Sequence, residues 1–251
     1  MPKVAAFTRM QRYVLLIAVL GLLGTAARAD DVPGIGDWEH YHFSLDEALV
    51  RVVFVHDVAG KLNFPLLTLP RSYIYFVNGA PPSTEGPLPE RIETNHIGLA
   101  FSDPEGDPWS VAVQKYMSEN AKSSTSAGKA LRASQYTVEL HPNTNSAWAE
   151  SVRTSTAHNH SLIGEPYPGI NEYSGAGSGS YFLGGEADEC VQAYCYNPRN
   201  EVFFCKYSTM ITKDIVAAID FLDFRMHGGP DYANRRVRFA REVVCRFLDE
   251  C

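Results

Sequence analysis

The first 29 residues combine a basic start, an apolar centre and a small-residue end, and this arrangement decides in which compartment the rest of the chain folds. Basic residues precede the apolar run 13–23 (YVLLIAVLGLL), and Ala27 and Ala29 lie where a signal peptidase requires small side chains. The run is roughly half the length of the ~20 apolar residues that a membrane-spanning helix needs. We therefore expect a cleavable signal peptide over residues 1–29, no membrane span, and a mature periplasmic protein that begins at Asp30.

All five cysteines lie in the last quarter of the chain. Export brings them into an oxidising compartment, where disulfides are favoured over reactive thiols. A zinc site is the alternative, but the chain has no C-x-x-C pair and only His227 lies nearby. We expect two disulfides and one free thiol among these candidates: Cys190, Cys195, Cys205, Cys245 and Cys251.

The charge of the chain limits the kinds of partner it can bind. It holds 22 basic and 29 acidic residues, a formal net charge of -7, with 45% hydrophobic residues, so it has the composition of an ordinary globular protein. Removing the four basic residues of the leader leaves 18 bases against 29 acids, a charge of -11. Nucleic acid and anionic membrane surfaces are therefore disfavoured as partners, and a basic partner agrees better.

The first half of the chain is dominated by extended segments. Residues rich in β-branched and aromatic side chains predict strands at 49–55, 65–69, 72–77, 91–101 and 135–140. The four prolines of residues 80–89 predict a surface loop. The acidic segment 103–108 predicts a turn; a calcium loop is the alternative, but its acids do not follow the EF-hand spacing.

The second half contains the most regular patterns. Residues 166–185 are rich in glycine and serine and predict long loops. A turn at 197–200 returns the strand 201–212 against residues 190–196 as a hairpin, and residues 215–226 fit either a strand or a helix. A closing amphipathic helix has apolar residues at helical spacing: Val237, Ala240, Val244, Phe247, Leu248 and Cys251.

These patterns indicate an α+β fold, with a mainly antiparallel sheet, long loops, a packed C-terminal amphipathic helix and stabilising disulfides. Residues 30–251 are expected to form a single domain, with two sub-lobes at 30–145 and 165–251 as the alternative. The predicted hairpin holds Cys195 within disulfide reach of Cys205. It leaves Cys190 to pair with Cys245 or Cys251 on the closing helix.

Two pairs of histidines have a spacing that a metal site could use. His40 with His42, and His158 with His160, would each point two rings to one face of a strand. No third ligand lies at a spacing that completes either pair. The sequence therefore predicts no bound metal and no cofactor.

A serine nucleophile is equally incomplete. Ser178 and Ser180 approach the G-x-S-x-G pattern, but no strand-to-helix context surrounds them. The nearby glycines also lack the preceding strand and following lysine of a phosphate-binding loop. No catalytic residue is therefore predicted.

Two regions resemble exported immunity proteins that accompany type VI secretion toxins of the lipase type. The first is residues 68–74 (TLPRSYI) with the extended segment 92–101 that ends at Asp103 and Pro104. The second is the cysteine-bearing strand 203–207 (FFCKY), a further strand and a closing helix. The resemblance implies an α+β inhibitor without catalytic residues, and a strand at 215–226. The middle, residues 109–179, is similar to nothing in that family.

Two classes of function are therefore expected from the sequence. Export, acidity, disulfides and the resemblance favour a periplasmic binding protein that inhibits a cognate protein toxin, and not an enzyme. The alternative is a secreted hydrolase whose residues meet in the fold, with His158, His160, Ser178 and Ser180 as the first candidates.

Overall fold

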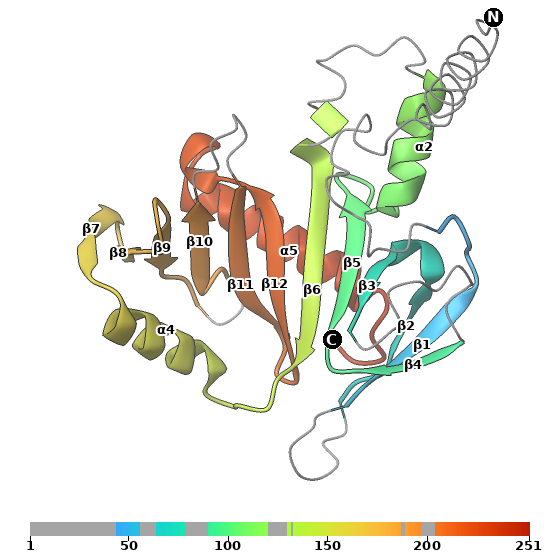
Figure 1. The fold of residues 1–251 in the computed structure, drawn as a ribbon, viewed down its shortest axis with the longest axis horizontal. Helices are drawn as coiled ribbons and strands as arrows, with labels where there is room; N and C mark the ends of the chain where they lie inside the picture. Colours follow the sequence, from blue (N-terminus) through green and yellow to red (C-terminus); the bar gives the residue numbers. More distant parts are fainter. Residues whose placement is uncertain are drawn as a thin grey trace, which may run out of the picture. The chain divides into compact units, whose positions relative to one another are not determined.

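The computed structural model describes residues 44–55, 64–78, 90–119, 130–131, 133–186, 189–196 and 204–251 (Figure 1). These residues all belong to one compact unit, Glu39–Cys251. Several predicted features lie outside the described residues: the signal peptide 1–29, the His40 and His42 pair, the loop 80–89 and the turn 197–200.

Nine strands form one large antiparallel sheet in the order β3-β5-β6-β12-β11-β10-β9-β8-β7. The central strands are the longest, and the edge strands β3 and β7 are shorter or irregular in register. The bounds are β3 Ile74–Val77, β5 Ile97–Ser102, β6 Gln135–Pro142, β7 Leu162–Tyr167, β8 Ile170–Ser174, β9 Ser180–Leu183, β10 Gln192–Tyr196, β11 Phe204–Thr212 and β12 Ile215–Leu222.

A second, three-stranded sheet has the order β2-β1-β4, with β1 Leu49–Phe54, β2 Leu67–Pro70 and β4 Arg91–Thr94. β1 runs antiparallel to β2 and parallel to β4. The chain after the last helix returns to this sheet, because the amide of Thr68 donates to the carbonyl of Phe247 at 2.8 Å. The C-terminal segment is therefore held against β2.

One face of the large sheet is covered by the C-terminal helix α5, Pro230–Cys245, which lies behind the central strands in Figure 1. The ring of Phe239 lies 5.2 Å from that of Tyr136 on β6, between ring centroids, and Tyr232 lies 6.1 Å from Phe221 on β12. The other elements are α2 Trp109–Glu119, α4 Trp148–Asn159, and the 3-10 turns η2 Arg71–Tyr73 and η3 Phe224–Met226. None of the described helices is long and apolar enough to cross a membrane.

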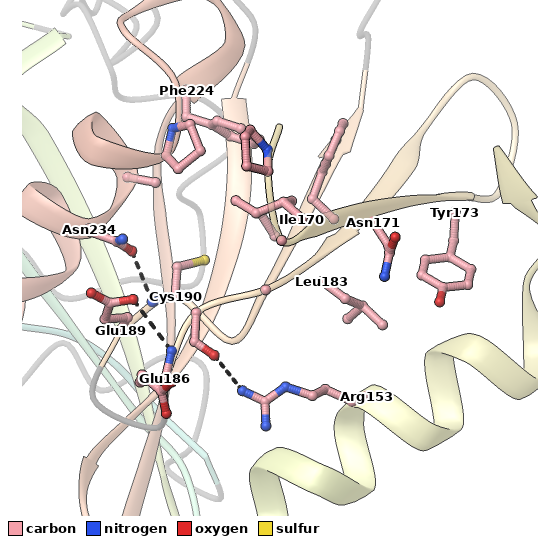
Figure 2. A pocket seen from close by; sticks show the side chains of 18 of the residues that line it. Arg153, Ile170, Asn171, Tyr173, Leu183, Glu186, Glu189, Cys190, Phe224 and Asn234 are labelled. Carbon is pink, nitrogen blue, oxygen red and sulfur yellow. Dashed lines mark hydrogen bonds between the residues drawn. The ribbon is translucent and has the colours of Figure 1, made fainter. Parts of the chain in front are cut away.

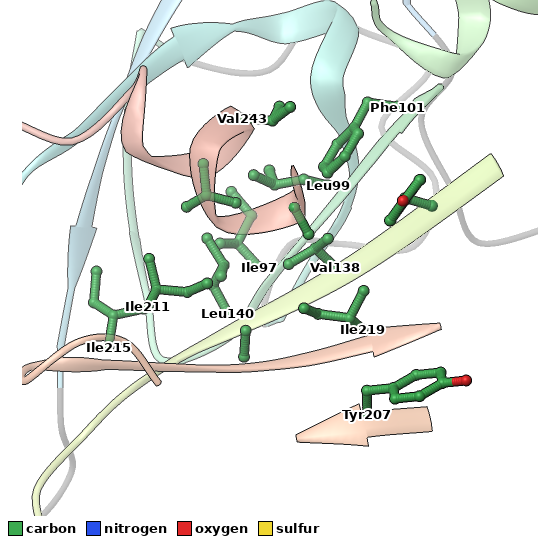
Figure 3. Close-up of a cluster of buried hydrophobic side chains, with 14 of the residues drawn as sticks. Ile97, Leu99, Phe101, Val138, Leu140, Tyr207, Ile211, Ile215, Ile219 and Val243 are labelled. Atoms are coloured by element: carbon green, nitrogen blue, oxygen red, sulfur yellow. The ribbon is translucent and has the colours of Figure 1, made fainter. Parts of the chain in front are cut away.

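The period-two pattern of the central strands explains why one sheet face forms the core (Figure 3). Along β11 and β12 buried and half-buried residues alternate without a break. The inward side chains, such as Val138, Ile219 and Val243 of α5, belong to one buried apolar cluster. The opposite face of the same strands keeps its side chains half-exposed, and we call it the open face.

The predicted fold class is confirmed: the structure is α+β, its large sheet is antiparallel, and a C-terminal amphipathic helix packs on it. The ambiguous segment forms the strand β12. The helix ends at Cys245, so Phe247 and Leu248 lie beyond it, and Phe247 packs its ring on Tyr73 at 4.7 Å.

The prediction of long loops over residues 166–185 is wrong. This segment contains β8, β9 and the end of β7. Its glycines serve tight turns: a Cβ on Gly179 would lie 2.6 Å from the hydroxyl of Tyr194, and Gly177 has a positive φ of 63°. The predicted single extended segment 91–101 is also two strands, β4 and β5, which belong to different sheets.

Two disulfides and one free thiol are present, as expected. Cys195 and Cys205 lie opposite each other on β10 and β11 and are bonded. The expected bridge from Cys190 to the closing helix is wrong, because Cys245 bonds Cys251 and Cys190 is free. After α5 the chain turns back, so that Cys251 bonds Cys245, the last residue of the helix.

The two disulfides should differ in their effect on stability. They close loops with sequence separations of 10 and 6 residues, for which chain entropy gives about 2.5 and about 2 kcal/mol. Cys195 and Cys205 are also buried, whereas Cys251 is exposed. We expect Cys195→Ala/Cys205→Ala to destabilise the protein more than Cys245→Ala/Cys251→Ala does. Urea unfolding of both double variants measures this, and the reverse order would contradict it.

Candidate binding face and neighbouring cleft

A row of large polar and aromatic side chains crosses the open face from strand to strand. The register places Tyr181 of β9 beside Tyr194 of β10, Tyr194 beside Lys206 of β11, and Lys206 beside Asp220 of β12. Thr137 of β6 continues the row beyond Asp220. In Figure 1 no described helix lies in front of the central strands β6, β12 and β11. The side chains of Tyr181, Tyr194, Lys206 and Asp220 are half-exposed.

Charged side chains at the middle of this row form an ion-pair network. The Lys206 ammonium lies 3.1 Å from both carboxylate oxygens of Glu139 and 3.7 Å from Oδ2 of Asp220. The hydroxyl of Thr137 donates to Asp220 at 3.2 Å. Side-chain exposure is 40% for Lys206, 25% for Glu139 and 30% for Asp220, so the network is neither fully solvated nor buried.

The electrostatics of the network favour a charged lysine and oppose a charged aspartate. Burial alone would lower the pKa of Lys206, but the carboxylates of Asp220 and Glu139 raise it above its usual range. Burial raises the pKa of Asp220 to about 6, against the opposing attraction of Lys206. The single ammonium of Lys206 thus forms ion pairs with the neighbouring carboxylates of Glu139 and Asp220.

Replacing Asp220 by asparagine is expected to stabilise the protein at neutral pH. Above pH 6 the native state holds an ionised Asp220 that is less favourable than in the unfolded chain; below about pH 4 both states are protonated and the difference disappears. Allowing for the partial exposure of this side chain, we expect Asp220→Asn to gain about 1 kcal/mol at pH 7.5. Urea unfolding at pH 7.5 and pH 4.5 should show the gain shrinking. Asp214→Asn, on an exposed turn, is the control, and an unchanged gain at low pH would contradict the prediction.

Two stacked histidines lie beside the network. His96 precedes β5, and its ring lies 4.0 Å from that of His141 on β6, between centroids, with an interplanar angle of 25°. Burial lowers the pKa of both imidazoles, that of His141 to about 4. Nε2 of His96 lies 3.8 Å from a carboxylate oxygen of Glu139, and it has no hydrogen-bond partner within the described structure.

A separate cleft of about 780 Å³ lies between α4, the β8–β9 hairpin and the start of α5 (Figure 2). Its lining includes Arg153, which donates to the carbonyl of Gly185 at 2.6 Å, and the free thiol of Cys190. Burial raises the pKa of Cys190 to about 12, so this thiol is protonated and unreactive at neutral pH. The cleft walls mix acidic, basic, amide and apolar groups.

The residues named as hydrolase candidates are not brought together. His158 and His160 end α4, and the ring of His160 packs on Tyr181 at 4.4 Å. Ser180 precedes Tyr181 on β9, so its side chain points to the opposite sheet face. Among the described hydrogen bonds, none joins these histidines to Ser178 or Ser180.

The side chains of the open-face cluster were missed by the sequence analysis. His96, Glu139, His141, Lys206 and Asp220 come from four separate segments of the chain. One local signal was present, because Glu139 and His141 stand two residues apart on a predicted strand and so share a face. His96 reaches them only through the pairing of β5 with β6, and Lys206 and Asp220 only through the pairing of β12 with β6 and β11.

Comparisons with known proteins assign no family to the chain. Neither protein-family models nor curated proteins match it. The crystal structure of the iron-regulated outer membrane lipoprotein FrpD of Neisseria meningitidis is similar over 84% of this chain and 99% of that chain, with 11% sequence identity and a TM-score of 0.32. A TM-score of this size does not establish a shared fold.

Proposed function

We propose that the mature protein is a periplasmic binding protein that inhibits a protein toxin by docking it on the open face of the large sheet. The observation that carries the proposal is the row of aromatic and charged side chains on that face. Tyrosine is enriched at protein interfaces, and the half-exposed Tyr181 and Tyr194 adjoin the Lys206 network. The opposite face is occupied by α5 and cannot serve.

The small side chains among the large ones shape this face. Ser208 and Ala218 lie with Glu139 in the neighbouring cross-strand row, which ends at Gly98, buried beneath the ring of Tyr75. The short side chains of Ser208 and Ala218 beside the larger Tyr181 and Tyr194 suit contact with a protruding segment of a partner protein. The acidity of the mature chain favours a partner with a basic surface.

The resemblance of residues 64–104 and 181–250 to immunity proteins supports a lipase-type toxin as the partner. Two disulfides support a location outside the cytoplasm. Inhibition requires no catalytic residues in this chain. The hydrolase alternative would require a nucleophile and a base to meet, which Ser180 and His160 do not do in this arrangement.

The proposal is tested first by asking whether a gene beside that of this protein encodes a lipase-type toxin, and then with that toxin and the purified mature protein. We expect a stable complex on size-exclusion chromatography and loss of the toxin's hydrolysis of p-nitrophenyl butyrate. The variant Tyr194→Ala/Lys206→Glu should weaken the complex at least about 100-fold. The matched control is Arg238→Glu, a charge reversal on an exposed residue of α5, which should leave binding unchanged.

Two outcomes would overturn the proposal. One is the absence of a complex with this toxin. The other is a complex that Arg238→Glu disrupts and Tyr194→Ala/Lys206→Glu does not, since it would place the interface on the helical side. Hydrolysis of the ester by this protein without the toxin would favour the hydrolase alternative.

A further inference from the structure

We propose that His96, Glu139 and His141 form a binding site for one divalent transition-metal ion, and that zinc is the ion it takes. Each residue offers one ligand atom, and these atoms all lie within 4.8 Å of one another. Two imidazole nitrogens and one carboxylate oxygen are a ligand set that zinc accepts. The site does not depend on the proposed partner.

The geometry needs little change to close around a metal. Metal–ligand bonds of about 2.1 Å place the ligand atoms of a tetrahedral site about 3.4 Å apart. The half-exposed side chains can close the remaining distance, at most about 1.4 Å, by rotating about their side-chain bonds. The main chain can stay in place, because the amide of Asn78 donates to the carbonyl of His96 at 2.9 Å and β6 is paired on both sides.

The two imidazoles are prepared to act as ligands. A ring nitrogen binds a metal through its lone pair, and one nitrogen of each ring lies within 4.8 Å of a carboxylate oxygen of Glu139. Within the described structure, Nε2 of His96 is buried and has no hydrogen-bond partner. A buried polar atom without a partner is unfavourable, and a bound cation between this nitrogen and Glu139 would satisfy it.

Lys206 is the competitor for the carboxylate. Its ammonium now neutralises Glu139 at 3.1 Å, and a metal ion would repel it. Asp220 offers an alternative partner at 3.7 Å, so the lysine can turn away without losing every carboxylate. The Lys206 ammonium should therefore lower the affinity of the site for zinc. If the two stacked histidines had only a structural role, zinc binding would not depend on Lys206.

The three ligands project from the open face, and α5 lies on the other side of the strands. Water would complete the coordination in the isolated protein. A site with three protein ligands and an open position differs from the closed four-ligand sites that hold small folds together.

Zinc chloride is the probe for this site. The tag-free mature protein is freed of metal with a chelator, and binding is followed by isothermal titration calorimetry at pH 7.5. We expect one zinc ion per chain, and His96→Ala and His141→Ala should each weaken binding at least about tenfold. The matched control is His158→Ala/His160→Ala, which removes two histidines from the end of α4 and should leave the affinity unchanged.

Lys206→Met is expected to increase the affinity for zinc, and a misfolded variant would not show such an increase. Removing the ammonium while keeping the aliphatic stem should tighten zinc binding at least about threefold. Thermal unfolding without metal checks that every variant is folded. The proposal is overturned if the wild-type protein binds no zinc, if binding persists in His96→Ala/His141→Ala, if the control abolishes it, or if Lys206→Met does not tighten it.

Discussion

Phe221→Ala is expected to lower the free energy of unfolding by about 3–5 kcal/mol, the usual cost of deleting a buried aromatic ring. Phe221 is 1% exposed and is the last inward-facing residue of β12. Its ring stacks on that of Tyr207 at 3.8 Å and 4°, and Tyr136 lies 5.6 Å away. The cavity left by alanine would be bordered by aromatic rings that cannot collapse into it without moving α5.

Urea unfolding of Phe221→Ala against the wild-type protein measures this cost. Tyr196→Ala is the control, because Tyr196 is an aromatic residue of the same sheet that is 42% exposed, and it should cost less than about 1 kcal/mol. Phe221→Leu should fall between the two. A loss below about 1 kcal/mol for Phe221→Ala would mean that the sheet and α5 do not share this core.

Arg225→Met is expected to cost about 3 kcal/mol, because it leaves a buried carboxylate without its cation. Asp223, between β12 and η3, has a side chain that is 1% exposed. Nε of Arg225 donates to both of its oxygens at 2.9 Å, and the Arg225 amide donates to Oδ1 at 2.9 Å. The guanidinium also lies over the Phe182 ring, with Cζ 5.3 Å from the ring centroid. Methionine therefore keeps the aliphatic stem of Arg225 but removes both the ion pair and this cation–π contact.

A double-mutant cycle separates the ion pair from simple packing. If the cost comes from the unpaired carboxylate, Asp223→Asn/Arg225→Met should be more stable than Arg225→Met alone. Thermal or urea unfolding of the four proteins gives the coupling energy. A double variant that is less stable than either single variant would contradict this explanation.

Local patterns predicted several elements correctly. In β6 and β11, alternate residues face a large buried core, so apolar and polar residues alternate along the sequence. The pattern of residues 215–226 fitted a strand or a helix, and the structure shows the strand β12 there. α5 could be predicted for the same reason at helical spacing, since Val237, Ala240 and Val244 are buried. The hairpin that joins Cys195 to Cys205 followed from two adjacent strands and a short connection.

Helices and strands that bury few side chains show no periodic spacing of apolar residues in the sequence. α4 buries only Thr156 among its 12 residues, and β7 buries none of its own. Helices and strands of this kind are held by their neighbours rather than by an apolar stripe of their own. The sequence therefore did not predict α2 or α4, and read the strands of residues 166–185 as loops.

The charged cluster on the open face shows the same limit at longer range. That Glu139 and His141 share a face is a property of one strand, because side chains alternate with a period of two. That His96, Lys206 and Asp220 meet them depends on which strands pair and in what register. Pairing is decided by the cooperative packing of the whole sheet against α5 and not by residues adjacent in the chain. Cysteine content and the alternation in β6 and β11 are compositional or local and follow from the sequence directly, whereas the candidate site exists only after distant segments come together.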